Sequence, residues 1–196
     1  MGKISKIEKS RKEYKCSECG KLIPIGSSYL KGILNFSKPI IRCLNCGLES
    51  WEVTTSEYKL QIGRIVNKWQ KDYEISEEGL QSIIQDLYDV LSDIECKYDD
   101  IPENLQESPT GELLNDRMDG LQNCINELEN ISYEELVDEE IGNISDDEIN
   151  DLIEENDISF NNNFEELPDD IQEKIINEAN NNLEEMINDA LSNLEY

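Results

Sequence analysis

Residues 16–20 read Cys16-Ser-Glu-Cys19-Gly20, and the same pattern returns at residues 43–47 as Cys43-Leu-Asn-Cys46-Gly47, with 23 residues between the two inner cysteines. Two residues between paired cysteines allow a tight turn that presents both sulfurs to one ion. The glycine after each pair can adopt a positive φ, which turns backbone N–H groups towards the sulfurs. Two such turns that face each other predict a tetrahedral, structural site for one Zn²⁺. Its four expected ligands are Cys16, Cys19, Cys43 and Cys46.

Other interpretations of these cysteines stay open at this point. Paired cysteines also form disulfides in secreted proteins, but the N-terminal segment lacks the apolar stretch of a secretory signal, which favours metal ligands. A redox role for one CxxC pair would leave the second, matched pair unexplained. Four thiolates also suit iron, so the ligand set alone does not decide between zinc and iron.

The segment between the two motifs predicts a β-hairpin. Residues 28–34 and 39–42 read as short strands, and residues 35–38 read as their connection. Together with the cysteine motifs, this is the pattern of a zinc ribbon. Helical patterns dominate the rest of the chain, so the expected fold class is α+β: a small zinc-ribbon β-hairpin module and a mostly α-helical, antiparallel hairpin or bundle.

Charge divides the chain into a basic part and an acidic part. The formal net charge of all 196 residues is −28. Residues 1–74 carry 14 Lys and Arg against 8 Asp and Glu, a net charge of +6. Residues 75–196 carry 3 Lys and Arg against 37 Asp and Glu, a net charge of −34. This asymmetry predicts separate partners for the two parts, or one part that covers the other.

Helical periodicity organises the chain after the second cysteine motif. A capping box at residues 54–57 predicts the start of a helix that has one apolar face as far as Tyr73. Apolar stripes predict two longer helices, at residues 76–99 and 109–131, joined by a short turn that contains two prolines. We expect these two helices to pack as an antiparallel hairpin.

Two more helices are predicted in the remaining sequence. A second capping box, at residues 145–148, opens a short helix, and another helix follows Pro168. The triplet Asn180-Asn181-Asn182 lowers the helix propensity of this last segment. Cys96 and Cys124 lie beside the stripes of the hairpin, so we expect small, buried or half-buried thiols there.

The patterns together predict three parts of the chain. Residues 1–53 form a basic zinc-ribbon module with an N-terminal arm, and residues 54–131 form a helical connector and the hairpin. Residues 132–196 form a highly acidic helical region.

The sequence excludes several classes of function. It contains no His, which rules out a Ser-His-Asp triad, a Cys-His pair and any metal site that needs an imidazole. No glycine-rich phosphate loop is present, and no glycine of the acidic part follows an Asp at the distance that an EF-hand loop needs. No apolar run of about 18 residues is present either. We therefore expect a protein that is not an enzyme and does not enter a membrane.

Two segments resemble a known group of proteins. Residues 9–57, KSRKEYKCSECG…IRCLNCGLESWEVTTSE, are similar to the zinc-ribbon start of small accessory proteins of bacteriophages. Residues 101–131, IPENLQESPTGELLNDRMDGLQNCINELENI, resemble the helical-hairpin segment of the same group. The group has no settled activity. The resemblance implies a zinc ribbon followed by an acidic helical hairpin, and a location in the cytoplasm of a bacterial host.

The acidic helices favour a role as a DNA mimic. DNA carries one negative charge per about 1.7 Å of its axis, and a helix rises about 1.5 Å per residue, so rows of carboxylates can imitate a phosphate track. We expect binding and inhibition of a basic, DNA-handling host protein, a nuclease or a defence enzyme. The residues expected to contact it are Asp138, Glu139, Glu140, Asp146, Asp147, Glu148, Glu154, Glu155, Glu165, Glu166, Asp169, Asp170, Glu184 and Glu185.

The alternative is a nucleic-acid-binding zinc ribbon with an acidic regulatory or partner-binding arm. Basic residues interleaved with aromatic residues suit phosphates and stacked bases. A solvated basic face with a flexible arm, or docking of the basic part on the acidic part, would account for the same residues. The candidate nucleic-acid contacts are Lys12, Lys15, Lys21, Tyr29, Lys31, Lys38 and Arg42.

Overall fold

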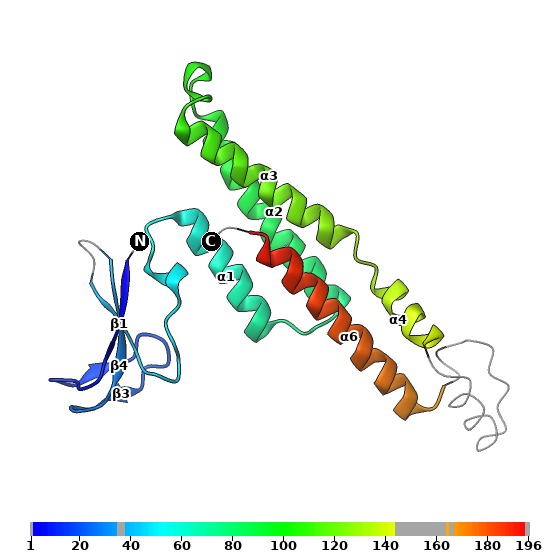
Figure 1. The fold of residues 1–196 in the computed structure, drawn as a ribbon, viewed down its shortest axis with the longest axis horizontal. Helices are drawn as coiled ribbons and strands as arrows, with labels where there is room; N and C mark the ends of the chain where they lie inside the picture. The colour runs from blue at the N-terminus through cyan, green and yellow to red at the C-terminus, as the bar shows by residue number, and fades with distance from the viewer. Residues whose placement is uncertain (1, 35–37, 144–163, 165–166, 195–196) are drawn as a thin grey trace. The chain divides into compact units, whose positions relative to one another are not determined.

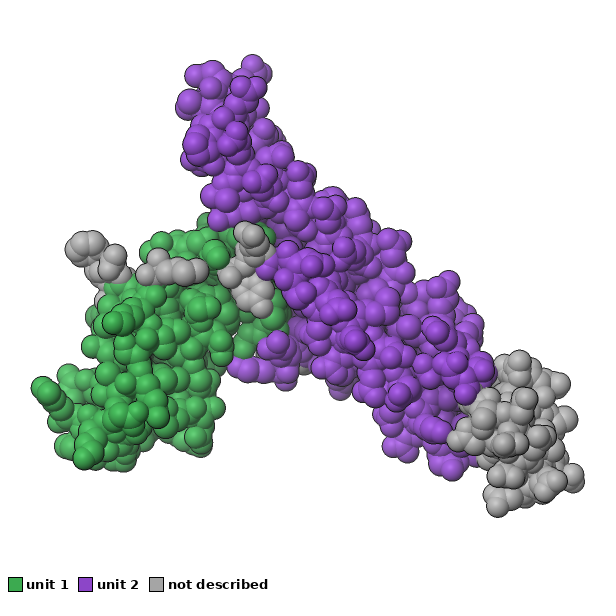
Figure 2. Space-filling view, in the orientation of Figure 1, with its two compact units in different colours: residues 1–67, 195–196 green, residues 68–194 purple. Residues whose placement is uncertain are grey.

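The computed structural model of the protein describes residues 2–34, 38–143, 164 and 167–194. The chain divides into two compact units, Met1–Asn67 with Glu195–Tyr196, and Lys68–Leu194 (Figure 2). Small antiparallel sheets form the N-terminal part of unit 1, and unit 2 is helical, so the predicted α+β class is confirmed (Figure 1). The predicted three-part division after residues 53 and 131 stays a prediction.

Unit 1 contains a three-stranded and a two-stranded antiparallel sheet. The first has the order β1-β4-β5, with β1 at Lys3–Ile7, β4 at Tyr29–Ile33 and β5 at Ile40–Arg42. The second pairs β2, Tyr14–Lys15, with β3, Leu22–Ile23. The pairing of β4 with β5 confirms the predicted hairpin. The sequence did not predict β1, which pairs with β4 along its whole length.

The core of the ribbon is built around its cysteines. Cys16, Ile23, Tyr29 and Ile41 form one buried cluster. Four partly buried side chains pack against this cluster: Ile7, Tyr14, Cys43 and Cys46. Strand β1 thus contributes Ile7 to the core, and the N-terminal arm is a structured part of the ribbon rather than a flexible extension.

A short 3-10 helix and α1 complete unit 1 and lead to unit 2. The 3-10 helix η1 spans Ser50–Val53, and α1 spans Glu57–Asp72. The predicted cap at Thr54 is wrong by two residues, because the Ser56 hydroxyl accepts the backbone N–H of Lys59 at 3.4 Å. Thr54 instead accepts the N–H of Ser56 at 3.1 Å, in the turn between the two helices.

Helices α2 and α3 of unit 2 form the predicted antiparallel hairpin. Helix α2 spans Glu77–Asp99, η2 spans Glu103–Leu105 and α3 spans Pro109–Glu129 (Figure 1). The side chains of Ser76 and Ser108 cap the two long helices at Gly79 and Gly111. Leu87 and Leu121 are fully buried, as the stripes require. Cys124 is buried as expected, but Cys96 is exposed, which corrects that part of the prediction.

Two further helices pack against each other in unit 2. Helix α4 spans Tyr133–Gly142 and α6 spans Asp169–Ser192. A small core of Ile141, Leu167 and Ile175 lies between them. The helix after Pro168 is confirmed, whereas α4 was not predicted. The short helix predicted from residue 145 lies outside the described residues.

Asparagines of α6 connect this helix to the other elements of unit 2. Three of them, and Asn193 at the C-cap of the helix, make side-chain hydrogen bonds with residues of other elements, so the Asn-rich segment is joined to its neighbours rather than loose. The bonds are Tyr133 Oη to Asn180 Oδ1 at 2.9 Å, Asn182 Nδ2 to Glu140 Oε1 at 2.9 Å, Trp69 Nε1 to Asn188 Oδ1 at 3.1 Å and Asn193 Nδ2 to Glu127 Oε2 at 3.4 Å.

None of the helices in the described part of the chain has both the length and the apolar character that crossing a membrane requires.

Candidate metal centre

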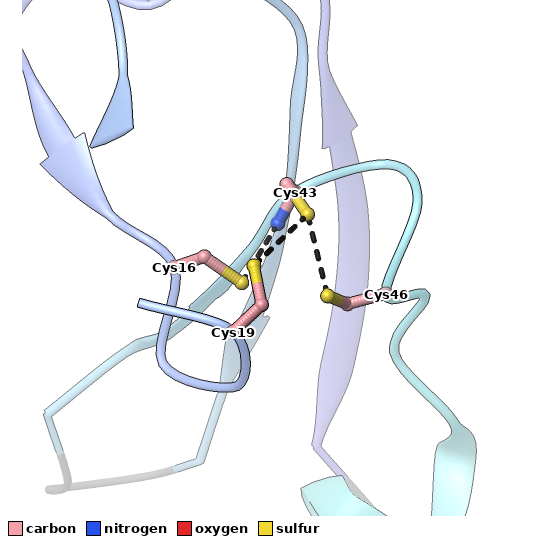
Figure 3. Close-up of side chains that lie close together, drawn as sticks. All are labelled: Cys16, Cys19, Cys43 and Cys46. Carbon is pink, nitrogen blue, oxygen red and sulfur yellow. Dashed lines mark hydrogen bonds between the residues drawn. The ribbon is translucent and has the colours of Figure 1, made fainter. Parts of the chain in front are cut away.

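The two cysteine motifs meet in space and present four sulfurs to one point. Cys16 and Cys19 lie on the turn between β2 and β3, and Cys43 and Cys46 lie on the turn that follows β5 (Figure 3). The four Sγ atoms all lie within 4.8 Å of one another. This is the grouping that the sequence predicted.

The separations of the sulfurs fit metal ligands and not disulfides. The Sγ atoms of Cys19 and Cys43 are 3.8 Å apart, and those of Cys43 and Cys46 are 3.4 Å apart. A disulfide needs about 2.05 Å between its sulfurs, and all six cysteines are free. Tetrahedral zinc with Zn–S bonds of about 2.3 Å would place its sulfurs about 3.8 Å apart. The four cysteines therefore fit a structural metal site.

The glycine after each motif has the predicted backbone conformation. Gly20 has a φ of 69° and Gly47 a φ of 67°, in the region that a residue with a Cβ rarely adopts. The two motifs are also joined directly, because the backbone N–H of Cys43 donates to the Sγ of Cys16 at 3.3 Å (Figure 3). One motif thus supplies a hydrogen-bond donor to a ligand of the other.

The environment of Cys16 favours a thiolate. Burial raises the pKa of Cys16, but hydrogen bonds from the backbone N–H groups of Cys43, Cys19 and Glu18 outweigh it and lower the pKa to about 6. The pKa of Cys46 is raised to about 12, chiefly through its hydrogen bond with Cys43 and then through that with Cys19. Four thiolates this close repel one another unless a cation neutralises them, so metal binding must displace protons.

Two further contacts hold the first motif against the rest of the ribbon. The backbone N–H and the hydroxyl of Ser17 both donate to the carbonyl oxygen of Ile41, at 2.8 and 2.7 Å. The guanidinium of Arg42 donates to the carboxylates of Glu18, in the first motif, and Glu52, in η1. Sequence reasoning did not find these contacts, because no local pattern links residues so far apart in the chain.

The structure changes the list of candidate nucleic-acid contacts. Tyr29 is only 5% exposed and lies in the ribbon core, so its ring offers no stacking face to a base. Arg42 is engaged by two carboxylates and its side chain is 13% exposed. The other five candidates make no ion pair with any carboxylate of the described residues; they are the half-buried Lys31 and the exposed Lys12, Lys15, Lys21 and Lys38.

Half of the candidate acidic contacts lie on described helices. Asp138 and Glu139 of α4 are exposed, and Glu140 is half-buried beside Asn182. The exposed acids of α6 are Asp169, Asp170, Glu184 and Glu185. Outside the described residues lie Asp146, Asp147, Glu148, Glu154, Glu155, Glu165 and Glu166.

A scan against protein-family models found no match to the chain, and neither did searches of curated proteins and of solved structures. The function of the protein must therefore be inferred from the chemistry and geometry of its own residues.

Proposed function

We propose that the protein is a non-enzymatic zinc-binding protein whose acidic helical unit binds a basic, DNA-handling protein in place of DNA. The partner class is a nuclease or defence enzyme of a bacterial host, and the protein would act there as a phage-type inhibitor. The zinc ribbon serves as a folding module in this proposal, since four thiolates leave no open coordination position for catalysis. Zinc suits this purely structural role, because it brings no redox chemistry.

The observation that carries the proposal is the charge of unit 2. Residues 68–194 hold 38 Asp and Glu against 5 Lys and Arg, a net charge of −33. Solubility of a small domain needs a net charge of only about 2 to 8 in magnitude. A surplus of this size repels itself and costs stability, so a binding partner of opposite charge is the expected gain. Residues 1–67 carry 12 Lys and Arg against 6 Asp and Glu, so the surplus is confined to the helical unit.

A capture experiment with DNA as competitor tests the proposal. Immobilised full-length, zinc-loaded protein is exposed to a bacterial lysate, and retained proteins are challenged with duplex DNA. A DNA mimic requires a retained protein that duplex DNA displaces, with affinity that falls steeply as salt rises. Retention that DNA does not reduce would contradict mimicry.

Charge-reversed variants test whether the acidic helices bind the captured protein. The tested variant changes Asp138, Glu139, Glu184 and Glu185 to Lys, because none of these residues lies in the first turn of its helix, where a positive charge would oppose the helix dipole. We expect at least about tenfold weaker binding. The matched control changes the same four residues to Asn or Gln, which removes half as much charge and should give an intermediate loss. Equal binding by all three proteins would refute the proposal.

The second candidate function is nucleic-acid binding by the ribbon. The specific observation in its favour is that five of its lysines lack a carboxylate partner among the described residues. Full-length protein in which Lys12, Lys15 and Lys21 are changed to Gln is compared with the parent chain in a titration of fluorescent single-stranded DNA. This candidate requires salt-sensitive binding that the triple variant loses.

A further inference from the structure

Burial along the α2–α3 hairpin ends well before the two helices are joined. Ile94 is the last buried residue of α2. The next buried residue that carries a side chain is Leu121, in α3. In the 26 residues from 95 to 120, only Gly111 is buried. The end of the hairpin that carries the connection therefore lacks the packed core present at its other end.

The position of α6 explains this change. Asn193, the residue directly after α6, bonds to Glu127, which lies near the end of α3 far from the connection. Figure 1 shows the connection between α2 and α3 extending beyond α6 within unit 2. Within unit 2, Figure 1 shows no other described helix beside the hairpin at that end. An apolar stripe normally needs a further layer, because one helix contact does not bury it.

Apolar side chains are present at this uncovered end. Leu105 is 49% exposed and Leu113 is 47% exposed. Four others are only partly buried. We call the six the hairpin-tip surface: Tyr98, Ile101, Leu105, Leu113, Leu114 and Met118.

The charge around these side chains restricts what can cover them. Residues 95–120 hold 8 Asp and Glu against 2 Lys and Arg, a net charge of −6. A second copy paired through its own hairpin tip would bring another surface of the same charge, and nucleic acids and anionic lipid surfaces are negative as well. Like charges placed opposite each other suppress such pairings. A complementary occupant is apolar on one side and positively charged at its edges.

We propose that the hairpin-tip surface docks a basic amphipathic helix of a partner protein. This inference rests on the proposed function and adds a specific contact to it. The acidic helices attract the basic partner over a long range, and the hairpin-tip surface binds an apolar face of that partner. Apolar anchors at the centre of an interface carry most of its binding energy, whereas exposed charges mainly speed association. The tip would then distinguish one basic partner from other basic proteins.

A synthetic helix of about 20 residues, with Leu on one face and Lys on the other, is the probe. A second peptide of the same composition has Leu and Lys shuffled so that it has no apolar face. The full-length zinc-loaded protein carries a fluorescent label on Cys96, which is exposed on α2 at this end of the hairpin. We expect the amphipathic peptide to bind at least about tenfold more tightly than its shuffled form.

Two double variants locate the binding. Leu105→Ser with Leu113→Ser should remove the preference for the amphipathic peptide. The matched control, Ile176→Ser with Met186→Ser, changes apolar residues of α6 that are 37% and 43% exposed and should retain it. Equal behaviour of the two variants, or no preference in the parent protein, would overturn the inference. If the first variant loses helical signal, Leu105→Ser alone replaces it, because Leu105 lies outside α2 and α3.

A second measurement tests whether a second copy of the chain, rather than a partner helix, occupies the hairpin-tip surface. Sedimentation equilibrium of the parent chain is expected to show a monomer, and a dimer that Leu105→Ser abolishes would show a second copy on this surface and overturn the inference. Failure of this inference can be distinguished from failure of the proposed function. A DNA-displaceable partner that binds the tip variant unchanged would remove this inference and leave the DNA mimic in place.

Discussion

The indole N–H of Trp69 donates to Oδ1 of Asn188 at 3.1 Å, joining two residues that are 119 positions apart in the chain. Trp69 lies near the end of α1 and is only 4% exposed, and Asn188 lies in the last turns of α6. A buried indole needs an acceptor, because an unpaired N–H group loses its hydration without compensation. This bond therefore ties the first helix segment of unit 2 to its last.

Replacing Asn188 with Leu should destabilise the protein by about 1–3 kcal/mol, since the Trp69 N–H is left without its acceptor. Urea unfolding followed by circular dichroism measures the change. In a Trp69→Phe background, which has no N–H group, the same replacement should cost much less. The control is Asn181→Leu: Asn181 is exposed and bonds only within α6, so its loss should be small. Equal costs in both backgrounds would contradict this account.

Replacement of Gly63 and of Gly120 with Ala should change the free energy of unfolding in opposite directions. A Cβ at Gly63 of α1 would lie 2.3 Å from ring atoms of Trp51, so the whole indole must move. We expect Gly63→Ala to destabilise by about 1–3 kcal/mol, because overpacking outweighs the helix propensity of Ala. Gly120 of α3 has nothing within 4 Å of such a Cβ, so Gly120→Ala should stabilise by about 0.5–1 kcal/mol. Thermal unfolding of zinc-loaded protein decides both signs.

Elemental analysis should find one zinc ion per chain in protein purified without added metal. Cys43→Ser should lose this ion, because Cys43 is a predicted ligand and lies 3.4 Å from Cys46. Cys96→Ser should keep it, since Cys96 lies on α2 outside the cluster. A folded, metal-free ribbon, or iron in place of zinc, would correct the assignment.

Removal of the metal should unfold the ribbon and spare the helices of unit 2. Metal binding supplies much of the folding free energy of a module this small, and its buried core includes Cys16, with Cys43 and Cys46 packed against it. Trypsin should then cut the chelated protein at Lys15, Lys21 and Lys31 much faster than at Lys97 and Lys174. Mass spectrometry of the fragments reports the order of cleavage. Equal protection of the ribbon with and without chelator would show that the metal is dispensable for folding.

The two cysteines of the hairpin should differ in reactivity. Cys124 is 1% exposed, and burial, followed by the nearby charge of Glu127, raises its pKa to about 12. Cys96 is exposed. At pH 8 the thiolate of Cys124 is therefore almost absent, and iodoacetamide should modify Cys96 long before it reaches Cys124 in the folded, zinc-loaded protein. Denaturant should abolish the difference, and peptide mapping reads both sites.

Features with a local cause could be predicted from the sequence. The glycines after the cysteine motifs, the serine caps of α2 and α3, and the apolar stripes of the hairpin all depend on residues within a few positions of each other. The cysteine cluster was also predictable, because two matched CxxC turns of this kind are typical ligands of a single metal ion.

Features that depend on distant partners were missed. Strand β1 is short and basic, and only its pairing with β4 defines it. That pairing places Ile7 opposite Tyr29, whose ring was predicted to be available to a base and is buried instead. Helix α4 has ten residues and gains its stability from packing on α6, which no local pattern reveals. Cys96 is exposed because it lies two residues after Ile94, on the face of α2 that points away from the buried stripe of the helix.

The asparagine contacts of α6 make the packing of the helices in unit 2 independent of the charges on its surface. The four bonds of Asn180, Asn182, Asn188 and Asn193 each use a neutral amide, either as acceptor for an aromatic side chain or as donor to a carboxylate. Counter-ions screen an ion pair between exposed charges, but they leave a bond made by a neutral amide largely intact. Helix packing in unit 2 should therefore hold in concentrated salt that abolishes electrostatic attraction to a partner. The exposed carboxylates are then free to change during evolution, one at a time, without loss of the fold that presents them.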